Sequence, residues 1–306
     1  HTEWAVRLME NQTRIESNSD FANTPAGMAQ RWDTEITASK KELKKWHDDA
    51  IKITRRYLDR RDDFGRDESR VNLFWSSMKV LLSLLYARPP KASVARSFLD
   101  ADDDQARVAG VIMQRLLNRS FDDNISNWDS SIRQGIEDWL IVGMGQGWLR
   151  YEVETQEEPM PPTIDPMTGM EIDTGETFER ITKEDAPLDY IYWQDFFYSP
   201  ARTWDEVRWV ARRVAMTRDQ LIARFGEEIG KTVALGTQSG TSDMRLNNEA
   251  PKYDPWSKAE VFEIWDKTSK MVYWMAKGSD VILDYKEDPL KLDGFFPCPK
   301  PLAANL

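Results

Sequence analysis

The hydrophobic pattern of the sequence changes its period at Gly143, and this change limits the folds that the chain can adopt. Before Gly143, apolar residues recur every three or four positions, which indicates amphipathic helices. After it, segments such as 148–154 (WLRYEVE) alternate apolar and polar residues, which indicates half-buried strands. We therefore predict an α+β fold, with a mainly helical lobe over residues 1–146 and a β-rich antiparallel lobe with short helices over residues 147–306.

The helical lobe should contain four helices. They are expected at about 34–61, from Asn72 to just before Arg88, from an N-cap at Asp102, and from about Ser126 to Gly143. The second helix belongs to the densest apolar stretch, NLFWSSMKVLLSLLYARPP, where Lys79 interrupts the roughly 20 apolar residues that a membrane span needs. Its polar stripe is narrow, so we expect a scaffold helix that is buried against other protein. The stripe consists of Asn72, Ser76, Lys79 and Ser83.

The β-rich lobe is expected to begin with a long hairpin or insertion over about 155–187, followed by a strand at 206–216. A short helix at 217–226 is bounded by Thr217 and Gly226. A polar loop at about 236–256 is predicted to be mobile. Three strands of an antiparallel meander should start near Ala259, Lys270 and Asp280.

Charge and cysteine content restrict the classes of function. The chain has 52 acidic and 41 basic residues, a net charge of −11, which opposes tight binding of a phosphate backbone. With one cysteine and two histidines, it can form neither an intrachain disulfide nor a Cys/His zinc cluster. These counts favour a reducing cytoplasm. We find no signal-peptide pattern after His1, and expect the chain to be a piece of a longer protein.

Two sequence motifs suggest ligand binding but have simpler explanations. GMGQG (143–147) lies between a helix and a strand, the reverse of the order in a dinucleotide-binding loop, so we interpret it as a helix C-cap with close backbone packing. The acidic runs Asp100–Asp104 and Asp165–Glu176 lack the spacing of an EF-hand. We interpret them as solvated, or as favourable charges at a helix N-terminus.

The remaining candidate groups lack partners for chemistry. His47 has no evident nucleophile beside it, so we expect a surface or interface histidine. Cys298, between two prolines, is expected to be a packed thiol. The aromatic run Tyr190–Tyr198 contains no basic residue, which favours a sheet core or a subunit interface over base stacking. We therefore predict no catalytic residue, no cofactor-binding residue and no metal ligand.

Four stretches, taken in order, resemble the portal proteins of tailed bacteriophages, particularly the larger type of short-tailed phages. The first is the Asn-led apolar helix with its Pro-Pro exit. The others are a helix that runs through a glycine-rich corner into a strand, a segment that begins DFFYSPARTWDEV and ends at a short helix, and a strand pair followed by GFFPCPKPL. They occupy residues 72–94, 138–154, 195–226 and 261–278, with the last continuing to 302.

This resemblance implies a structural protein and not an enzyme. Portal subunits form a ring, usually dodecameric, at one capsid vertex, through which a terminase motor drives double-stranded DNA and through which DNA later leaves. Their parts are a wing, a stem, a clip and often a crown, and both lobes of this chain resemble the wing region of a larger protein. The implied partners are further copies of the chain, the terminase, capsid or scaffold protein, the tail adaptor, and DNA that passes without tight binding.

The resemblance also implies location in the virion at the portal vertex, and in the host cytoplasm during assembly, with no cofactor and no membrane. Two other classes of function stay open at this point. One is a metal-dependent hydrolase or nuclease that uses the Asp/Glu clusters, which would depend on Asp102 and Asp104. The other is a generic phage adaptor without a channel.

Overall fold

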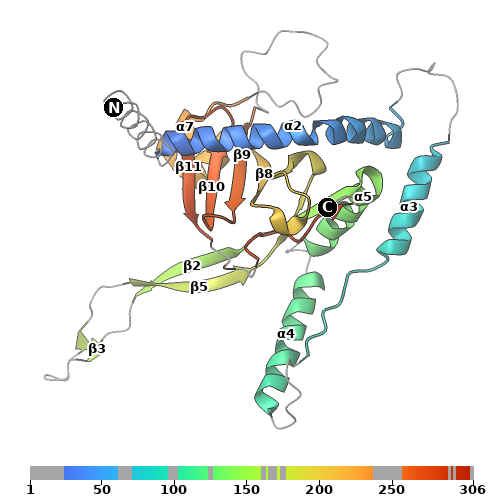
Figure 1. The fold of residues 1–306 in the computed structure, drawn as a ribbon. Helices are drawn as coiled ribbons and strands as arrows, with labels where there is room; N and C mark the ends of the chain where they lie inside the picture. The colour runs from blue at the N-terminus through green and yellow to red at the C-terminus, as the bar shows by residue number, and fades with distance from the viewer. Residues whose placement is uncertain are drawn as a thin grey trace, which may run out of the picture.

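The centre of the molecule is a five-stranded antiparallel sheet with the strand order β11-β10-β9-β8-β7 (Figure 1). Its strands are β7 Phe196–Tyr198, β8 Trp209–Met216, β9 Ala259–Asp266, β10 Met271–Ala276 and β11 Ile282–Glu287. The computed structural model describes residues 24–60, 71–95, 103–122, 127–159, 163–164, 171–172, 177–236, 257–288, 291 and 294–303. Helices precede antiparallel sheets and short helices, so the predicted α+β class is confirmed.

Both faces of this sheet are covered, and alternate residues of each strand therefore enter two different cores. In β9, Phe262 and Ile264 pack with Trp32 of helix α2 (Pro25–Tyr57). Val261 and Trp265 face the opposite core, which helix α6 (Arg218–Phe225) and the segment 294–298 help to form. The long helix α2 thus belongs to the same packed body as the C-terminal strands, as Figure 1 shows.

Helix α2 begins earlier than its predicted start near Thr34. The Thr24 hydroxyl accepts a hydrogen bond from the backbone N–H of Gly27 at 3.1 Å, and Pro25 occupies the first helical turn. This Thr-Pro pair is a standard helix start, because proline has no N–H to leave unsatisfied there. The prediction was wrong because the apolar seam was traced only from Leu43 onward, although Trp32 is buried in the sheet core.

The other predicted helices are confirmed with small changes of boundary. They are α3 Leu73–Leu85, α4 Asp104–Asp122 and α5 Trp128–Val142. Asn72 caps α3 by accepting from the Trp75 backbone N–H at 3.0 Å, and Gly143 ends α5 with a φ of 81°. The predicted cap Asp102 lies outside the described residues. Asp103 caps α4 instead, since its carboxylate accepts from the Ala106 backbone N–H at 2.9 Å.

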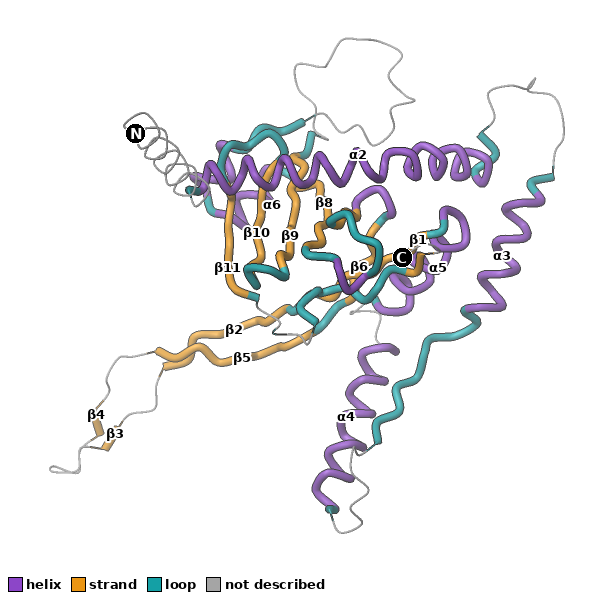
Figure 2. Tube along the Cα trace, in the orientation of Figure 1, coloured by secondary structure: helices purple, strands orange, loops and turns teal. Residues whose placement is uncertain are grey.

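A smaller sheet, β12-β1-β6, lies beneath α5. Its strands are β12 Leu302–Ala303, β1 Met144–Leu149 and β6 Leu188–Ile191. The predicted single strand 148–154 is broken at Arg150–Tyr151, where the chain leaves this sheet and enters the hairpin of β2 (Glu152–Pro159) and β5 (Thr177–Asp185). The hairpin extends away from the body (Figure 2), and β3 (Thr163–Ile164) pairs with β4 (Glu171–Ile172) farther along it.

The C-terminal half differs from the prediction in two details. The predicted strand 206–216 begins only at Trp209, because a 3-10 turn, η2 (Trp204–Glu206), precedes it. The predicted meander is confirmed as β9–β11, but β8 and β7 extend it to five strands. A second 3-10 turn, η1, spans Trp193–Asp195, and helix α7 spans Glu227–Thr232.

All of the predicted mobile loop except Gly236 lies outside the described residues. Gly236, just before this segment, forms an antiparallel bridge with Lys258, just after it. No helix in the described ranges combines the length and apolar character of a membrane span.

Candidate interaction surface

Two residues of the polar stripe, Asn72 and Lys79, connect helix α3 to the rest of the chain. The Lys79 ammonium lies 2.6 Å from a carboxylate oxygen of Glu137 on α5, and the Tyr57 hydroxyl of α2 donates to the same oxygen at 2.7 Å. Asn72 donates from its side-chain amide to the Tyr57 carbonyl at 2.7 Å. Although burial acts to raise the pKa of Glu137, the hydrogen bonds from Lys79 and Tyr57 hold it below its usual value. A polar cluster therefore attaches α3 to the body.

Most of the large apolar residues of α3 nevertheless face outward. Leu82 is the only buried residue of the helix, whereas Leu73 and Leu84 are 72% and 74% exposed. The prediction of a buried scaffold helix is wrong for this chain alone, among the residues that are described. The side that contacts the chain is mixed, because Ser76 and Ser83 of the stripe are exposed whereas the apolar Leu82 is buried. Periodicity showed how narrow the polar stripe is, but not which side of the helix contacts the protein.

Helix α4 exposes its apolar face in the same way. The extended residues 91–95 run beside it, held by side-chain amides: Asn118 accepts from the Ala92 N–H at 2.9 Å, and Gln114 accepts from the Val94 N–H at 3.2 Å. These contacts use the polar side of α4. The rest of the helix surface presents large apolar residues, namely Val108, Val111, Ile112, Met113, Leu116 and Leu117, all at least 40% exposed.

We call the exposed apolar residues of α3 and α4 the arm surface. On α3 it comprises Leu73, Trp75, Val80, Leu81, Leu84 and Leu85, and on α4 the six residues just named. Soluble monomers rarely expose apolar patches larger than a few hundred Å², and larger ones mark interaction sites. Burying one such side chain contributes roughly 1.5–3 kcal/mol. The chemistry of the arm surface suits the binding of another apolar protein surface.

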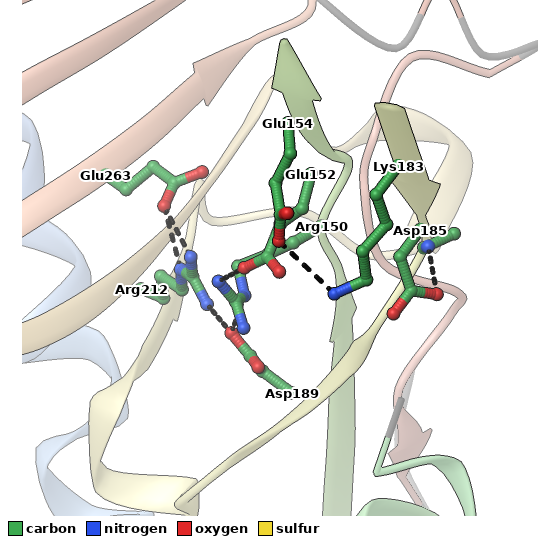
Figure 3. A network of polar contacts seen from close by, with 9 residues as sticks. Arg150, Glu152, Glu154, Lys183, Asp185, Asp189, Arg212 and Glu263 are labelled. Atoms are coloured by element: carbon green, nitrogen blue, oxygen red, sulfur yellow. Dashed lines mark hydrogen bonds and ion pairs between the residues drawn. The ribbon is translucent and has the colours of Figure 1, made fainter. Parts of the chain in front are cut away.

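A network of ion pairs lies where the hairpin joins the two sheets (Figure 3). Arg212 of β8 lies 2.8 Å from both Glu263 of β9 and Asp189 of β6. Arg150, at the break between β1 and β2, also pairs with Asp189 at 2.5 Å and with Glu152 of β2. The network thus connects the central sheet, the small sheet and the hairpin.

The contacts around this network indicate that its charged groups hold the sheets and the hairpin together. The Arg212 guanidinium also lies over the Trp148 ring, 5.1 Å from its centre, and Glu263 accepts from the Trp265 indole N–H at 2.9 Å. A cavity of about 520 Å³ beside it is lined by both arginines, Glu263 and Trp265. Because each carboxylate of the network pairs with a guanidinium, none is left as an uncompensated base for catalysis.

The glycine motif acts as the sequence suggested. Gly143 is the C-cap of α5, and residues 144–147 belong to β1. A Cβ atom on Gly145 would lie 1.9 Å from the Gly135 carbonyl oxygen, so helix and strand are in backbone contact. The prediction of a helix cap with close packing is confirmed.

The acidic runs lie only partly within the described residues. Asp103 caps α4 and Asp104 pairs with Arg107 at 3.0 Å, whereas 100–102 and most of 165–176 are outside the description. In the described part of the chain, no group of three or more His, Cys, Asp or Glu residues could hold a metal ion.

The other candidates are packing residues. His47 is half-buried where α2 packs against η1, with ring centres 5.1 Å from Trp46 and 5.7 Å from Trp193, and burial lowers its pKa. It keeps a partly exposed edge, so the surface or interface histidine stays a prediction. Cys298 is buried, which raises its pKa, so the packed thiol is confirmed. In the aromatic run, Trp193 and Phe196 are buried as predicted.

One buried carboxyl was missed by sequence reasoning. Asp138 of α5 is only 9% exposed and accepts a hydrogen bond from the Tyr190 hydroxyl of β6. Burial raises the pKa of Asp138 to about 6, although the hydrogen bonds from Tyr190 and the Trp193 backbone act in the opposite direction. Nothing in the sequence distinguishes Asp138 from the other acidic residues, because its burial depends on the strand that crosses beneath α5.

No family model matches the chain, and no curated protein matches it.

Proposed function

We propose that the chain is the wing region of a portal subunit, which assembles into a ring at one capsid vertex and forms the conduit for packaging and ejection of double-stranded DNA. The observation that carries the proposal is the arm surface, because α3 and α4 expose most of their large apolar residues. Such helices are suited to a subunit whose neighbours complete its core. The proposed role is structural and requires no cofactor.

The order of the resembling stretches supports the same proposal. The stretch 72–94 forms α3 and the extended segment that leads to α4, and 138–154 forms the passage from α5 into β1 and the hairpin. The net charge of −11 is suited to a channel through which DNA slides without being held. In the complete protein, the proposed partners are the terminase motor, capsid or scaffold protein, and the tail adaptor.

The proposal predicts that charge on the arm surface prevents self-association. The double substitution L84E/L116E introduces two carboxylates at exposed positions, so the free energy of unfolding should change by less than about 1 kcal/mol. Self-association, measured by sedimentation velocity over a concentration series, should weaken at least tenfold. A matched control, V281E/Y285E, changes two apolar residues of similar exposure on and beside β11, and should associate like the wild type.

Equal association of both double variants and the wild type would contradict the role of the arm surface. A wild-type chain that stays monomeric and shows metal-dependent hydrolysis, lost on replacing Asp102 and Asp104, would favour the hydrolase instead.

A further inference from the structure

The β2–β5 hairpin has no packing partner along most of its length in the described residues. In each strand all residues but one are exposed, so both faces of the hairpin are open to solvent. A two-stranded hairpin without a covering layer is only marginally stable in water. Figures 1 and 2 show the hairpin extending away from α2 and from the central sheet. It is therefore an unpartnered sheet face that another molecule can reach.

The hairpin carries two carboxylates in an unfavourable arrangement. Glu157 of β2 and Glu179 of β5 are direct partners in the antiparallel register, so their side chains lie on the same face with Cβ atoms about 5 Å apart. Like charges at directly opposed positions are destabilising. Neighbouring hairpin carboxylates are compensated, since Glu154 pairs with Lys183 and Glu158 with Arg180. Glu157 and Glu179 have no such partner anywhere in the described ranges.

Helix α2 carries the opposite arrangement. Lys41 and Lys45 are exposed and one helical turn apart, which places their Cβ atoms about 5–6 Å from each other. Their neighbours Lys44 and Lys52 pair with Asp48 and Asp49 at 2.8 and 3.0 Å. Across the described part of the chain, Lys41 and Lys45 have no carboxylate within ion-pair distance. The spacing of this lysine pair therefore matches the spacing of the Glu157/Glu179 pair.

The surrounding charges point the same way. The two hairpin strands contain seven acidic and two basic residues, and residues 40–56 of α2 contain seven basic and three acidic residues. The two surfaces are thus complementary over more than one pair. Because the hairpin extends away from α2 in the same molecule (Figure 1), one chain cannot bring them together without leaving this fold.

We propose that Glu157 and Glu179 of one copy bind Lys41 and Lys45 of the next copy. The contact uses two different surfaces of the chain, which is the head-to-tail type that generates rings. It relieves two like-charge pairs at once. This inference rests on the proposed self-assembly and adds to it a second contact, electrostatic and salt-sensitive, that is separate from the arm surface.

A charge-swap experiment tests the contact with the whole chain. E157K/E179K and K41E/K45E each place like charges against the proposed partner, so each should weaken self-association at low ionic strength at least tenfold in sedimentation velocity. The quadruple variant restores opposite charges and should return to within about threefold of the wild type. Added salt should weaken the wild-type association, because exposed ion pairs are screened. The control D205K/E228K changes the net charge by the same amount as E157K/E179K, at exposed positions elsewhere, and should leave association unchanged.

Cross-linking locates the contact directly. Chains with E157C are mixed with chains with K45C and treated with a short bismaleimide, since lysine–glutamate contacts hold the backbones farther apart than the roughly 7 Å limit of a disulfide. Cys298 is buried and should not react. The mixture should give a cross-linked heterodimer, and E157C mixed with D205C should not.

The contact is wrong if the quadruple variant associates as weakly as the poorer double variant, if neither reversal changes association, or if the wild type stays monomeric at low salt. Two outcomes separate this inference from the proposed function. If both charge-reversed variants still form closed rings, the portal proposal is supported and this contact is contradicted. A rescued charge swap in dimers or open chains would establish the contact and contradict the ring.

Discussion

At two positions near the passage from α5 to β1, the surroundings restrict which residue can be accommodated. The carbonyl oxygen of Gly135 lies where a Cβ on Gly145 would have to be, and the carboxyl of Asp138 is enclosed one helical turn farther along. Backbone contact at Gly145 requires a residue without a side chain, and a buried carboxyl requires hydrogen-bond donors. The sequence shows the first requirement through its glycine motif but gives no sign of the second.

Replacing Gly145 with alanine should destabilise the protein strongly. The added methyl group meets backbone rather than a flexible side chain, so we expect a loss of roughly 3 kcal/mol in the free energy of unfolding. The matched control is G110A in α4, where a Cβ meets only Val94 at 3.9 Å and alanine favours the helix. In urea denaturation, the midpoint of G145A should lie far below that of the wild type, and the midpoint of G110A should equal or slightly exceed it. Equal midpoints would show that helix and strand are not in backbone contact.

The raised pKa of Asp138 predicts a pH dependence of stability with a definite sign. Because the pKa is about 6 in the folded protein against an ordinary 3.8, the folded state binds this proton more tightly than the unfolded chain. The resulting stabilisation is complete below about pH 4 and is lost as the pH rises through about 6. It amounts to roughly 3 kcal/mol.

The variant D138N removes this titration and keeps an oxygen that can accept from Tyr190. The free energy of unfolding of D138N relative to wild type should therefore rise by up to about 3 kcal/mol between pH 4 and pH 8. Glu137 stays in place, so its effect cancels in the comparison. A difference that is constant over this range, measured by urea denaturation, would show that Asp138 titrates normally.

At the scale of elements, several helix ends could be predicted, whereas the start of α2 and the buried faces could not. Asn72, Gly143 and the capping box at Thr217 place three ends correctly, because a cap satisfies backbone groups of its own helix. The buried side of α5 is instead formed by Ser131, Gly135, Asp138 and Val142. Periodicity identifies the apolar side of a helix, and in α3, α4 and α5 much of that side is not the one that the chain covers.

The attachment of α3 should therefore depend on its polar residues. Replacing Lys79 with alanine leaves Glu137 without its cation and removes a hydrogen bond worth about 1–2 kcal/mol. Amides of α3 should exchange with solvent at least threefold faster, while those of the central sheet stay unchanged. The control K44A removes an exposed ion pair within α2 that contributes little. Unchanged exchange in α3 of K79A would show that other contacts hold the helix.

At the scale of the whole molecule, the class of fold followed from the change of period at Gly143, but the arrangement of the sheets did not. The central sheet joins β8 to β9, although the polar segment 237–256 separates them in sequence. Trp32 of α2 helps to close one face of a sheet built by residues after 195. Such pairings depend on contacts between distant segments, which local patterns of polarity do not encode.

The same scale carries the central claim, that copies of this chain complete one another. The arm surface leaves apolar side chains exposed, and the hairpin and α2 leave opposite charges unpaired, so each copy presents surfaces that a neighbour can cover. In a closed ring, neighbours cover the interaction surfaces of every copy, whereas an open chain leaves one surface of each kind exposed at its ends.

Negative-stain electron microscopy of the complete gene product tests this claim most directly. The account predicts closed rings of uniform subunit number, with a central hole about as wide as a DNA duplex, and predicts that L84E/L116E abolishes them. A monodisperse monomer, or an open filament without a hole, at concentrations where the protein is folded would contradict it.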